Sequence, residues 1–251
     1  MSFKSSLNKL IKWNPQKDVI IGFTIGLIIL LLSVSMILLK NYTLINIVIR
    51  DVVMILIVGI AFPLYRINRE NNFKDYGIHL KKWYLFLPIN FILGFLLLLM
   101  FLKESPLPNN FSFNQVIIWK IVYIMLAGIF EIVVFYSFIR TIIERSFGII
   151  PAVIITALFY SFHHAGFQPE FGKLLFVGIL YASVYRIGNS ALLIFPFFWG
   201  VGACYDVLIQ STEVSEIIYP EIRSIIILIG IIIIVAYLLK TKSVRTSSNS
   251  A

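Results

Sequence analysis

The chain has 251 residues, of which 59% are hydrophobic and 13% charged, and its formal net charge is +9 at pH 7. Several apolar runs approach or exceed the roughly 20 residues that a helix needs to cross a bilayer, which excludes an ordinary soluble domain. Because each span in lipid must satisfy its own backbone hydrogen bonds, the composition predicts an all-α, polytopic helical membrane protein. The basic residues are spread over the loops between spans, so no nucleic-acid partner is expected.

Residues 1–17 predict a basic amphipathic segment at the membrane surface. Phe3, Leu7 and Leu10 share one helical face, with lysines elsewhere, until Pro15 ends the pattern. We expect an interfacial helix that its lysines hold to anionic headgroups of the lipid bilayer. The apolar stretch that follows is too long for the apolar region of a signal peptide, so cleavage is not expected.

Eight apolar segments follow, and we expect each to cross the membrane within one transmembrane domain of residues 18–239. They lie at about residues 19–39, 51–65, 83–102, 116–138, 149–164, 174–185, 190–209 and 222–239. The polar stretch 240–251 predicts a disordered cytoplasmic tail.

The distribution of basic residues predicts how these spans are oriented. With the N-terminus inside, most lysines and arginines fall in the segments on the cytoplasmic side. Those in the outer loops are Lys40, Arg50, Lys103, Lys173 and Arg223. This bias follows the positive-inside rule and predicts a multi-pass protein of the cell membrane with both termini in the cytoplasm.

Glu131 is a lone carboxylate inside the apolar run 116–138. A charge at membrane depth costs roughly 2.5–3.5 kcal/mol or more, so such groups usually mark a functional site. Ala127 and Gly128, one turn earlier, allow a neighbouring helix to approach closely beside the carboxylate. We interpret Glu131 as a general base or proton carrier; the alternative is a structural ion pair with Lys120, which lies on nearly the same face.

His163 and His164 lie at the outer end of the fifth span. Adjacent residues on a helix point about 100° apart, so we do not expect the two imidazoles to bind one metal ion together. One histidine is expected to face the bundle and the other a loop or water. The alternative is that they are interfacial residues held by ordinary hydrogen bonds. No metal ion or cofactor is expected.

Asp206 is a third polar group, near the outer end of the seventh span. Gly202 and Ala203, one turn earlier, leave room beside its carboxylate. The alternative is a hydrated aspartate at a helix end. The single cysteine, Cys204, excludes an intrachain disulfide.

Two of these groups lie in short motifs that resemble a known family. The string EIVVFYSFIR begins at Glu131, and the string FYSFH, in the next span, ends at His163. They resemble the first two motifs, Glu-Glu-x-x-x-Arg and Phe-x-x-x-His, of the CPBP family of intramembrane endopeptidases (CAAX proteases and bacteriocin-processing enzymes, also called Abi). The resemblance implies a four-helix core at about residues 116–209.

The chain departs from the family pattern at several positions. Ile132 replaces the second glutamate, and Tyr136 replaces the motif arginine. The family's third motif, His-x-x-x-Asn or Asp, falls around residues 199–202, where the chain has no histidine. Asp206 stands near the place of the Asn or Asp.

The resemblance implies an endopeptidase that hydrolyses a peptide bond in a membrane-embedded or membrane-associated peptide. Glu131 would be the base that activates a water molecule, and His163 would orient that water or stabilise the oxyanion. His164, Asp206 and Tyr136 are the candidates to support them in place of the missing motif residues. The scheme requires no metal ion.

Two other functions remain open at this stage. A family member without activity would bind a membrane peptide or a partner protein, for example in bacteriocin immunity or envelope regulation. A small transporter would use Glu131, Lys120 and Asp206 to carry protons, although the sequence has no inverted repeat that indicates one.

Overall fold

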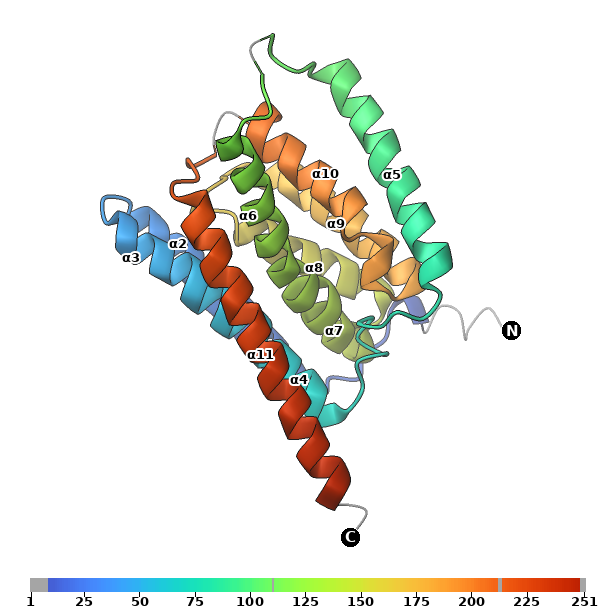
Figure 1. The fold of residues 1–251 in the computed structure, drawn as a ribbon. Coiled ribbons are helices and arrows are strands. Elements are labelled where there is room, and N and C mark those ends of the chain that lie inside the picture. Colours follow the sequence, from blue (N-terminus) through green and yellow to red (C-terminus); the bar gives the residue numbers. More distant parts are fainter. Residues whose placement is uncertain (1–8, 110, 212–213, 249–251) are drawn as a thin grey trace.

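The computed structural model describes residues 9–109, 111–211 and 214–248, with side chains described as far as residue 241. All regular elements in these ranges are helical. They are α2 (Asp18–Leu38), α3 (Thr43–Ile47), η1 (Val48–Ala61), α4 (Phe62–Glu70), α5 (Trp83–Glu104), α6 (Gln115–Glu131), η2 (Ile132–Ile139), α7 (Arg140–Phe147), α8 (Ile149–Phe162), α9 (Phe171–Gly188), η3 (Ala191–Leu193), α10 (Phe197–Tyr205), η4 (Asp206–Gln210) and α11 (Pro220–Ser248). The elements α3, η1 and α4 form one continuous rod, as do α6, η2 and α7 (Figure 1).

Six of the described helices are long and apolar enough to span a membrane, which confirms the prediction of a multi-pass, all-α membrane protein. They are the helices at residues 18–38, 43–70, 83–104, 115–147, 171–188 and 220–241. The predicted spans 149–164 and 190–209 correspond to the 14-residue helix α8 and to the interrupted segment from η3 to η4. The count of eight spans therefore stays a prediction.

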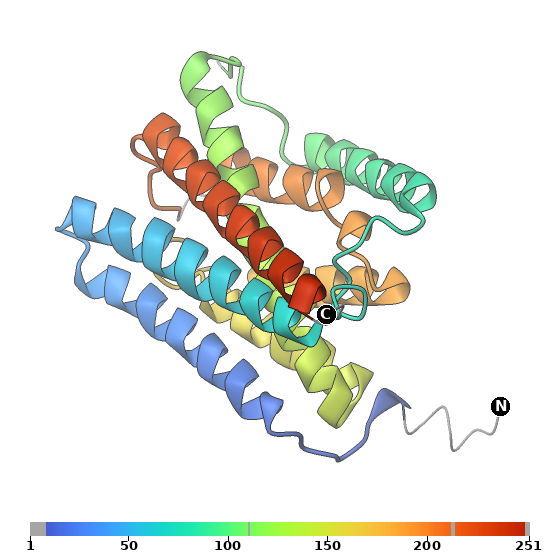
Figure 2. The same cartoon turned by 60° about the horizontal axis from the view of Figure 1, so that its bottom comes forward.

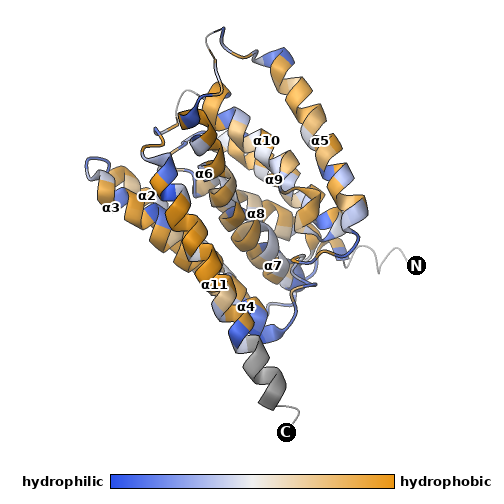
Figure 3. Ribbon diagram, in the orientation of Figure 1, coloured by the Kyte–Doolittle hydropathy of each residue, from blue (hydrophilic) through white to orange (hydrophobic). Residues whose placement is uncertain are grey.

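The rod α6–η2–α7 forms the centre of the bundle. Every residue of η2, from Ile132 to Ile139, is buried, because neighbouring helices cover it on all sides. Helix α11 packs along α6 and η1, α2 packs on η1, and α8 pairs with α9 (Figures 1 and 2). Apolar side chains cover the outer faces of these helices, whereas hydrophilic residues gather at the ends (Figure 3). This distribution is the one a bilayer requires.

Helix α5 lies at the edge of the bundle and packs mainly on α10 (Figures 1 and 2). Its buried residues are Asn90 and Gly94. The Asn90 Oδ1 atom accepts hydrogen bonds from the backbone amides of Phe197, at 2.8 Å, and Phe198, at 3.1 Å. These bonds satisfy two of the free amides at the start of α10, so this amide side chain joins the apolar contacts that hold α5 to that helix.

The segments that the sequence places in the cytoplasm come together at one end of the bundle. Arg66 pairs with Asp18 at 3.1 Å, and Arg145 pairs with Glu70 at 3.3 Å. The Asn68 amide donates to Thr241 near the end of α11 at 3.4 Å. The predicted grouping of these loops on one side thus agrees with the packing.

The two ends of the chain differ from their predictions. Residues 1–8 of the predicted interfacial helix lie outside the described residues, and the chain is not helical over 11–16, because the Lys12 and Asn14 amides bond instead to the Phe147 and Ser146 carbonyls. At the other end α11 continues to Ser248, where the sequence predicted disorder for 240–251. Extending an existing helix adds one hydrogen bond for each residue fixed, so the polar composition does not end it. Residues 249–251 lie outside the described ranges.

Candidate active site

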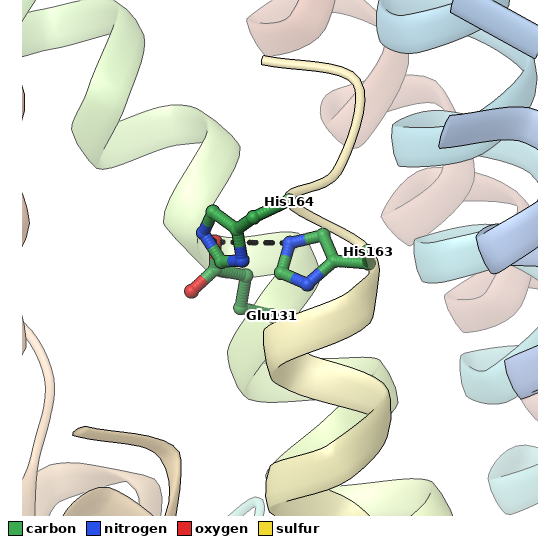
Figure 4. A group of neighbouring side chains, drawn as sticks. All are labelled: Glu131, His163 and His164. Carbon is green, nitrogen blue, oxygen red and sulfur yellow. Dashed lines mark ion pairs between the residues drawn. The ribbon is translucent and has the colours of Figure 1, made fainter. Parts of the chain in front are cut away.

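Glu131 is the last residue of α6, at the point where the central rod passes into the π-helical stretch η2. Its side chain is buried, with 8% exposed. The Oε1 atom lies 3.4 Å from His163 Nε2 and 3.7 Å from His164 Nε2, while Oε2 accepts a 3.0 Å hydrogen bond from the Trp199 indole (Figure 4). Glu131 thus has these partners in place of the ion pair with Lys120 that the sequence left open as an alternative. The π-helical stretch η2 begins directly after it, and π-helical turns are frequent at functional sites.

Both histidines face Glu131, so the prediction that they diverge is wrong (Figure 4). Helix α8 ends at Phe162, and the chain turns over residues 163–167, so the 100° rotation of a continuing helix does not apply. His163 is 1% exposed and His164 4%, and their ring centroids lie 3.8 Å apart. Neither histidine points away from Glu131.

A serine of α2 fixes the turn that carries the histidines. The Ser33 hydroxyl donates to the His163 carbonyl at 2.5 Å and accepts from the Gly166 amide at 2.9 Å. A Cβ atom at Gly166 would lie 2.3 Å from the Ser33 carbonyl oxygen, so only glycine allows the turn to approach α2 this closely. The position of the imidazoles is thus determined by a helix more than a hundred residues earlier in the chain.

The Tyr160 carbonyl orients both imidazole rings. His163 Nδ1 lies 2.5 Å from this oxygen and His164 Nδ1 lies 2.8 Å from it. Because a carbonyl oxygen only accepts, each Nδ1 must carry the hydrogen. In the neutral rings each Nε2 therefore presents a lone pair towards Glu131.

A cavity of about 360 Å³ adjoins this group, between α5, α6, α9 and α10. Glu131 and His164 contribute to its lining, together with apolar side chains such as Leu97 and Leu180. His163 lies behind them and packs against Phe130 and Phe135, with ring centroids 5.6 and 4.7 Å away. The histidine that shares the cavity with Glu131 is thus His164, which the sequence assigned only a supporting role.

Asp206 lines the same cavity but is bound to other groups. Its carboxylate pairs with Lys173 and accepts a 2.7 Å hydrogen bond from the Gln168 amide. It is 9% exposed, so it is not the hydrated helix-end aspartate of the alternative interpretation. In the described part of the chain its hydrogen-bond and ion-pair partners are Gln168 and Lys173 and neither histidine, so the structure gives it no direct part in orienting His163.

Tyr136 is not brought to the group. Its ring packs among Tyr160, Tyr181 and Tyr185, with centroids 5.8, 6.2 and 6.2 Å away. Its buried hydroxyl has no hydrogen-bond partner among the described residues, and the side chain does not contribute to the cavity lining.

Trp199 is a hydrogen-bond partner of Glu131 that the sequence did not single out. Its indole reaches Glu131 because Gly128 leaves space on α6: a Cβ atom there would lie 2.2 Å from the Trp199 Cη2 atom. The predicted close helix approach beside the carboxylate is confirmed. The sequence offered one signal, since Trp199 carries a side-chain donor in the stretch 199–202 that the resemblance compares with a motif histidine.

These contacts define a multi-pass helical membrane protein with a buried carboxylate and two imidazoles beside a cavity. No protein-family model, curated protein or solved structure matches the chain. One ligand atom from each of Glu131, His163 and His164 lies within 4.8 Å of the others, so the group could hold a water molecule or a small cation.

Proposed function

We propose that this chain is an intramembrane endopeptidase of the CPBP type, which hydrolyses a peptide bond in a membrane-embedded or membrane-associated peptide. The observation that supports it best is the convergence of Glu131 with His163 and His164 beside a cavity at membrane depth. Peptide hydrolysis needs a base to activate water and a donor to stabilise the oxyanion, and both kinds of group are present.

In this proposal a water molecule lies between Glu131 Oε1 and the two Nε2 atoms. Glu131 takes one proton from this water as the oxygen attacks the scissile carbonyl, and it then passes the proton to the leaving amine. A water molecule has two hydrogens, so Glu131 Oε1 accepts one of them and the Nε2 lone pairs of the two imidazoles share the other, since the Tyr160 carbonyl holds each Nδ1 hydrogen. His164 is the imidazole nearer the substrate because it contributes to the cavity lining.

Trp199 takes the place of the missing histidine of the third motif. In the resting state its indole donates to Glu131 Oε2 at 3.0 Å. When Glu131 becomes protonated it accepts this bond less strongly, since charge-assisted hydrogen bonds are the stronger ones. The same N–H is then available to the developing oxyanion, and a donor of this kind is worth about 10²–10³ in rate.

The cavity lining favours an apolar, extended substrate. Leu97 and Met100 of α5 and Phe176 and Leu180 of α9 contribute to it, and all except Leu97 are exposed on the surface that lipid would cover. A peptide could therefore enter from the bilayer. In this proposal the chain crosses the cell membrane eight times with both termini cytoplasmic, supported by the positive-inside pattern and by the grouping of the basic loops.

The test compares the membrane peptidome of cells that express the native chain with that of cells that express Glu131→Gln. Glutamine retains an acceptor for the Trp199 indole but is not a base, so we expect insertion to be unchanged and processing to fall by about 10²–10⁴-fold. The matched control is His79→Asn, which changes the histidine that lies in a loop, where its ring accepts from the Lys81 amide.

Processing at the native level by Glu131→Gln would refute the hydrolytic proposal. A protective or regulatory phenotype that survives the combined change of Glu131 and His163 would favour a family member without activity.

A further inference from the structure

Arg50 differs from the other buried or half-buried arginines of the described chain because it has no carboxylate partner. The others each form an ion pair at 2.6–3.3 Å, and they are Arg66, Arg140, Arg145, Arg186 and Arg223. The Arg50 side chain is half-buried, and its guanidinium carbon lies 3.9 Å from the centre of the Phe167 ring. It forms no hydrogen bond or ion pair with any residue that the structure describes. A cation withdrawn from water is costly unless an anion compensates it.

A second guanidinium adds to the positive charge at this place. The guanidinium carbons of Arg223 and Arg50 lie 4.3 and 5.5 Å from the centre of one ring, that of Tyr123. Asp51 and the Tyr123 hydroxyl satisfy Nε and Nη2 of Arg223, whereas its Nη1 atom has no hydrogen-bond partner in the described ranges. One carboxylate is therefore bound between two guanidiniums, and one positive charge remains uncompensated.

Both arginines contribute to the lining of a groove of about 180 Å³. Lys40, Thr43 and Ser215 add an ammonium group and two hydroxyls to this lining. A single water molecule needs about 10–15 Å³, so the groove has room for a polar group several times larger.

The charge of the groove fits an anion with a single negative charge. Lys40, Arg50 and Arg223 carry three positive charges. Two carboxylates oppose them, Asp51, which is bound to Arg223, and Glu216, which is exposed in the lining. Guanidinium and ammonium groups are the side chains that bind phosphate oxygens best, and hydroxyls can add further donors.

The groove lies at the end of the bundle opposite the paired basic loops. Its lining comes from the places where α2 ends, where the rod of α3, η1 and α4 begins and where α11 begins (Figure 1). The opposite ends of these helices carry the Asp18–Arg66 pair and Thr241. Spans that end here bring the groove to the level of lipid headgroups. Exposed apolar residues of the same turns, such as Leu44 and Ile222, would contact the acyl chains.

We propose that this groove binds a phosphate group with one negative charge, through Arg50, Lys40 and the Nη1 atom of Arg223. The phosphate belongs either to the headgroup of an anionic phospholipid, which basic pockets between membrane helices bind, or to free inorganic phosphate. The inference goes beyond the proposed hydrolysis and does not depend on it, because neither Glu131 nor the two histidines beside it line the groove.

The first arm of the test measures lipid binding. The full-length chain is delipidated in detergent micelles, titrated with phosphatidylglycerol or phosphatidylcholine and analysed by native mass spectrometry. Both lipids contain a phosphate, but only phosphatidylglycerol has a net negative charge, so we expect the native chain to bind it more tightly. Arg50→Gln should weaken this binding by about 10–100-fold, as expected for a lost hydrogen bond to a charged group. Lys40→Gln should weaken it by about 5-fold.

Two further variants serve as controls. Lys103→Gln removes an exposed lysine in the last turn of α5 that does not line the groove, so it should bind phosphatidylglycerol like the native chain. Glu216→Gln removes the exposed carboxylate of the lining and should bind it about 2–5-fold more tightly. A misfolded variant would not show such a gain.

The second arm adds inorganic phosphate to the lipid-free micelles and measures the unfolding temperature. A rise for the native chain and Lys103→Gln, but not for Arg50→Gln, would show that phosphate alone is sufficient. No rise, together with selective binding of phosphatidylglycerol, would identify the lipid headgroup as the ligand.

Three results would overturn the site. The native chain would neither prefer phosphatidylglycerol nor respond to phosphate, or Arg50→Gln would bind like the native chain. The third is an equal loss in Lys40→Gln and Lys103→Gln, which would show only a general attraction between basic residues and anionic lipid. Neither arm measures cleavage, so a failure of the proposed hydrolysis would leave these results unchanged.

Discussion

A single methyl group at Gly128 should disturb the site without touching its ionisable residues. A Cβ atom there would lie 2.2 Å from Trp199 Cη2, 2.3 Å from Cζ3 and 2.8 Å from Cζ2. Ordinary contact begins at 3.4 Å, so in Gly128→Ala the indole must move by roughly 1 Å. That movement stretches its 3.0 Å hydrogen bond to Glu131.

The expected cost follows from these contacts. Overpacking a well-filled interior costs about 1–3 kcal/mol, and a hydrogen bond to a charged group is worth about 1.5–3 kcal/mol. Alanine recovers about 1 kcal/mol in helix propensity. We expect Gly128→Ala to lower the free energy of unfolding by roughly 2–4 kcal/mol, which for a chain of this size lowers the unfolding temperature by roughly 5–15 °C.

The matched control is Gly172→Ala in α9, where an added Cβ atom meets nothing within 4 Å. That variant should be as stable as the native chain or slightly more stable. Trp199→Phe provides the second test, because phenylalanine lacks the ring atoms that clash, so Gly128→Ala should cost little in that background. Thermal unfolding of the native chain, Gly128→Ala, Trp199→Phe and the double variant in nanodiscs gives the coupling energy. An equal cost of Gly128→Ala in both backgrounds would refute the proposed contact.

Three further tests examine how buried polar groups are satisfied, each by thermal unfolding in the same nanodiscs. Arg223 donates to Asp51 at 2.6 and 2.8 Å, and the Tyr123 hydroxyl accepts from Arg223 and donates to Asp51 at 2.8 Å. Arg223→Met should therefore lower the free energy of unfolding by about 3–5 kcal/mol, and adding Asp51→Leu and Tyr123→Phe should restore most of it. No recovery would contradict a self-contained buried cluster. Asn90→Leu removes the acceptor for two backbone amides of α10 and should lower the free energy of unfolding by about 1–3 kcal/mol. An unchanged unfolding temperature would mean that α5 is fixed by its apolar contacts alone. Tyr136→Phe removes a hydroxyl without a partner among the described residues and should be neutral or stabilising; a loss above about 2 kcal/mol would reveal a bond that the structure lacks.

The sequence predicted the class of fold because composition alone decides it. Apolar runs of membrane length can only be helices, and six of them have that length in the structure. The N-terminal segment and the tail were predicted less well. The N-terminal segment depends on hydrogen bonds to a distant part of the chain, and the tail depends on the continuation of α11. Lys12, for example, donates its amide to the Phe147 carbonyl.

The position of Glu131 in the site was predictable because a lone carboxylate at membrane depth needs partners. Its partners were only partly predictable. Periodicity places His163 and His164 about 100° apart, but it describes a helix that continues, whereas α8 ends at Phe162. The end of α8 depends on Ser33, which accepts from the Gly166 amide and donates to the His163 carbonyl. No local pattern contains that information.

The same reasoning explains why Asp206 does not join the group, although the resemblance named it as a supporting residue. A carboxylate joins the partner that offers the most donors, and Lys173 and Gln168 together satisfy Asp206 at the edge of the cavity. Among the residues that the structure describes, Glu131 has the Trp199 indole as its one donor within hydrogen-bond distance, and the two imidazole Nε2 acceptors lie beside it. A buried carboxylate with so few donors is stable only if it binds a proton or a cation, so the acceptor-rich geometry itself points to the chemistry of the site.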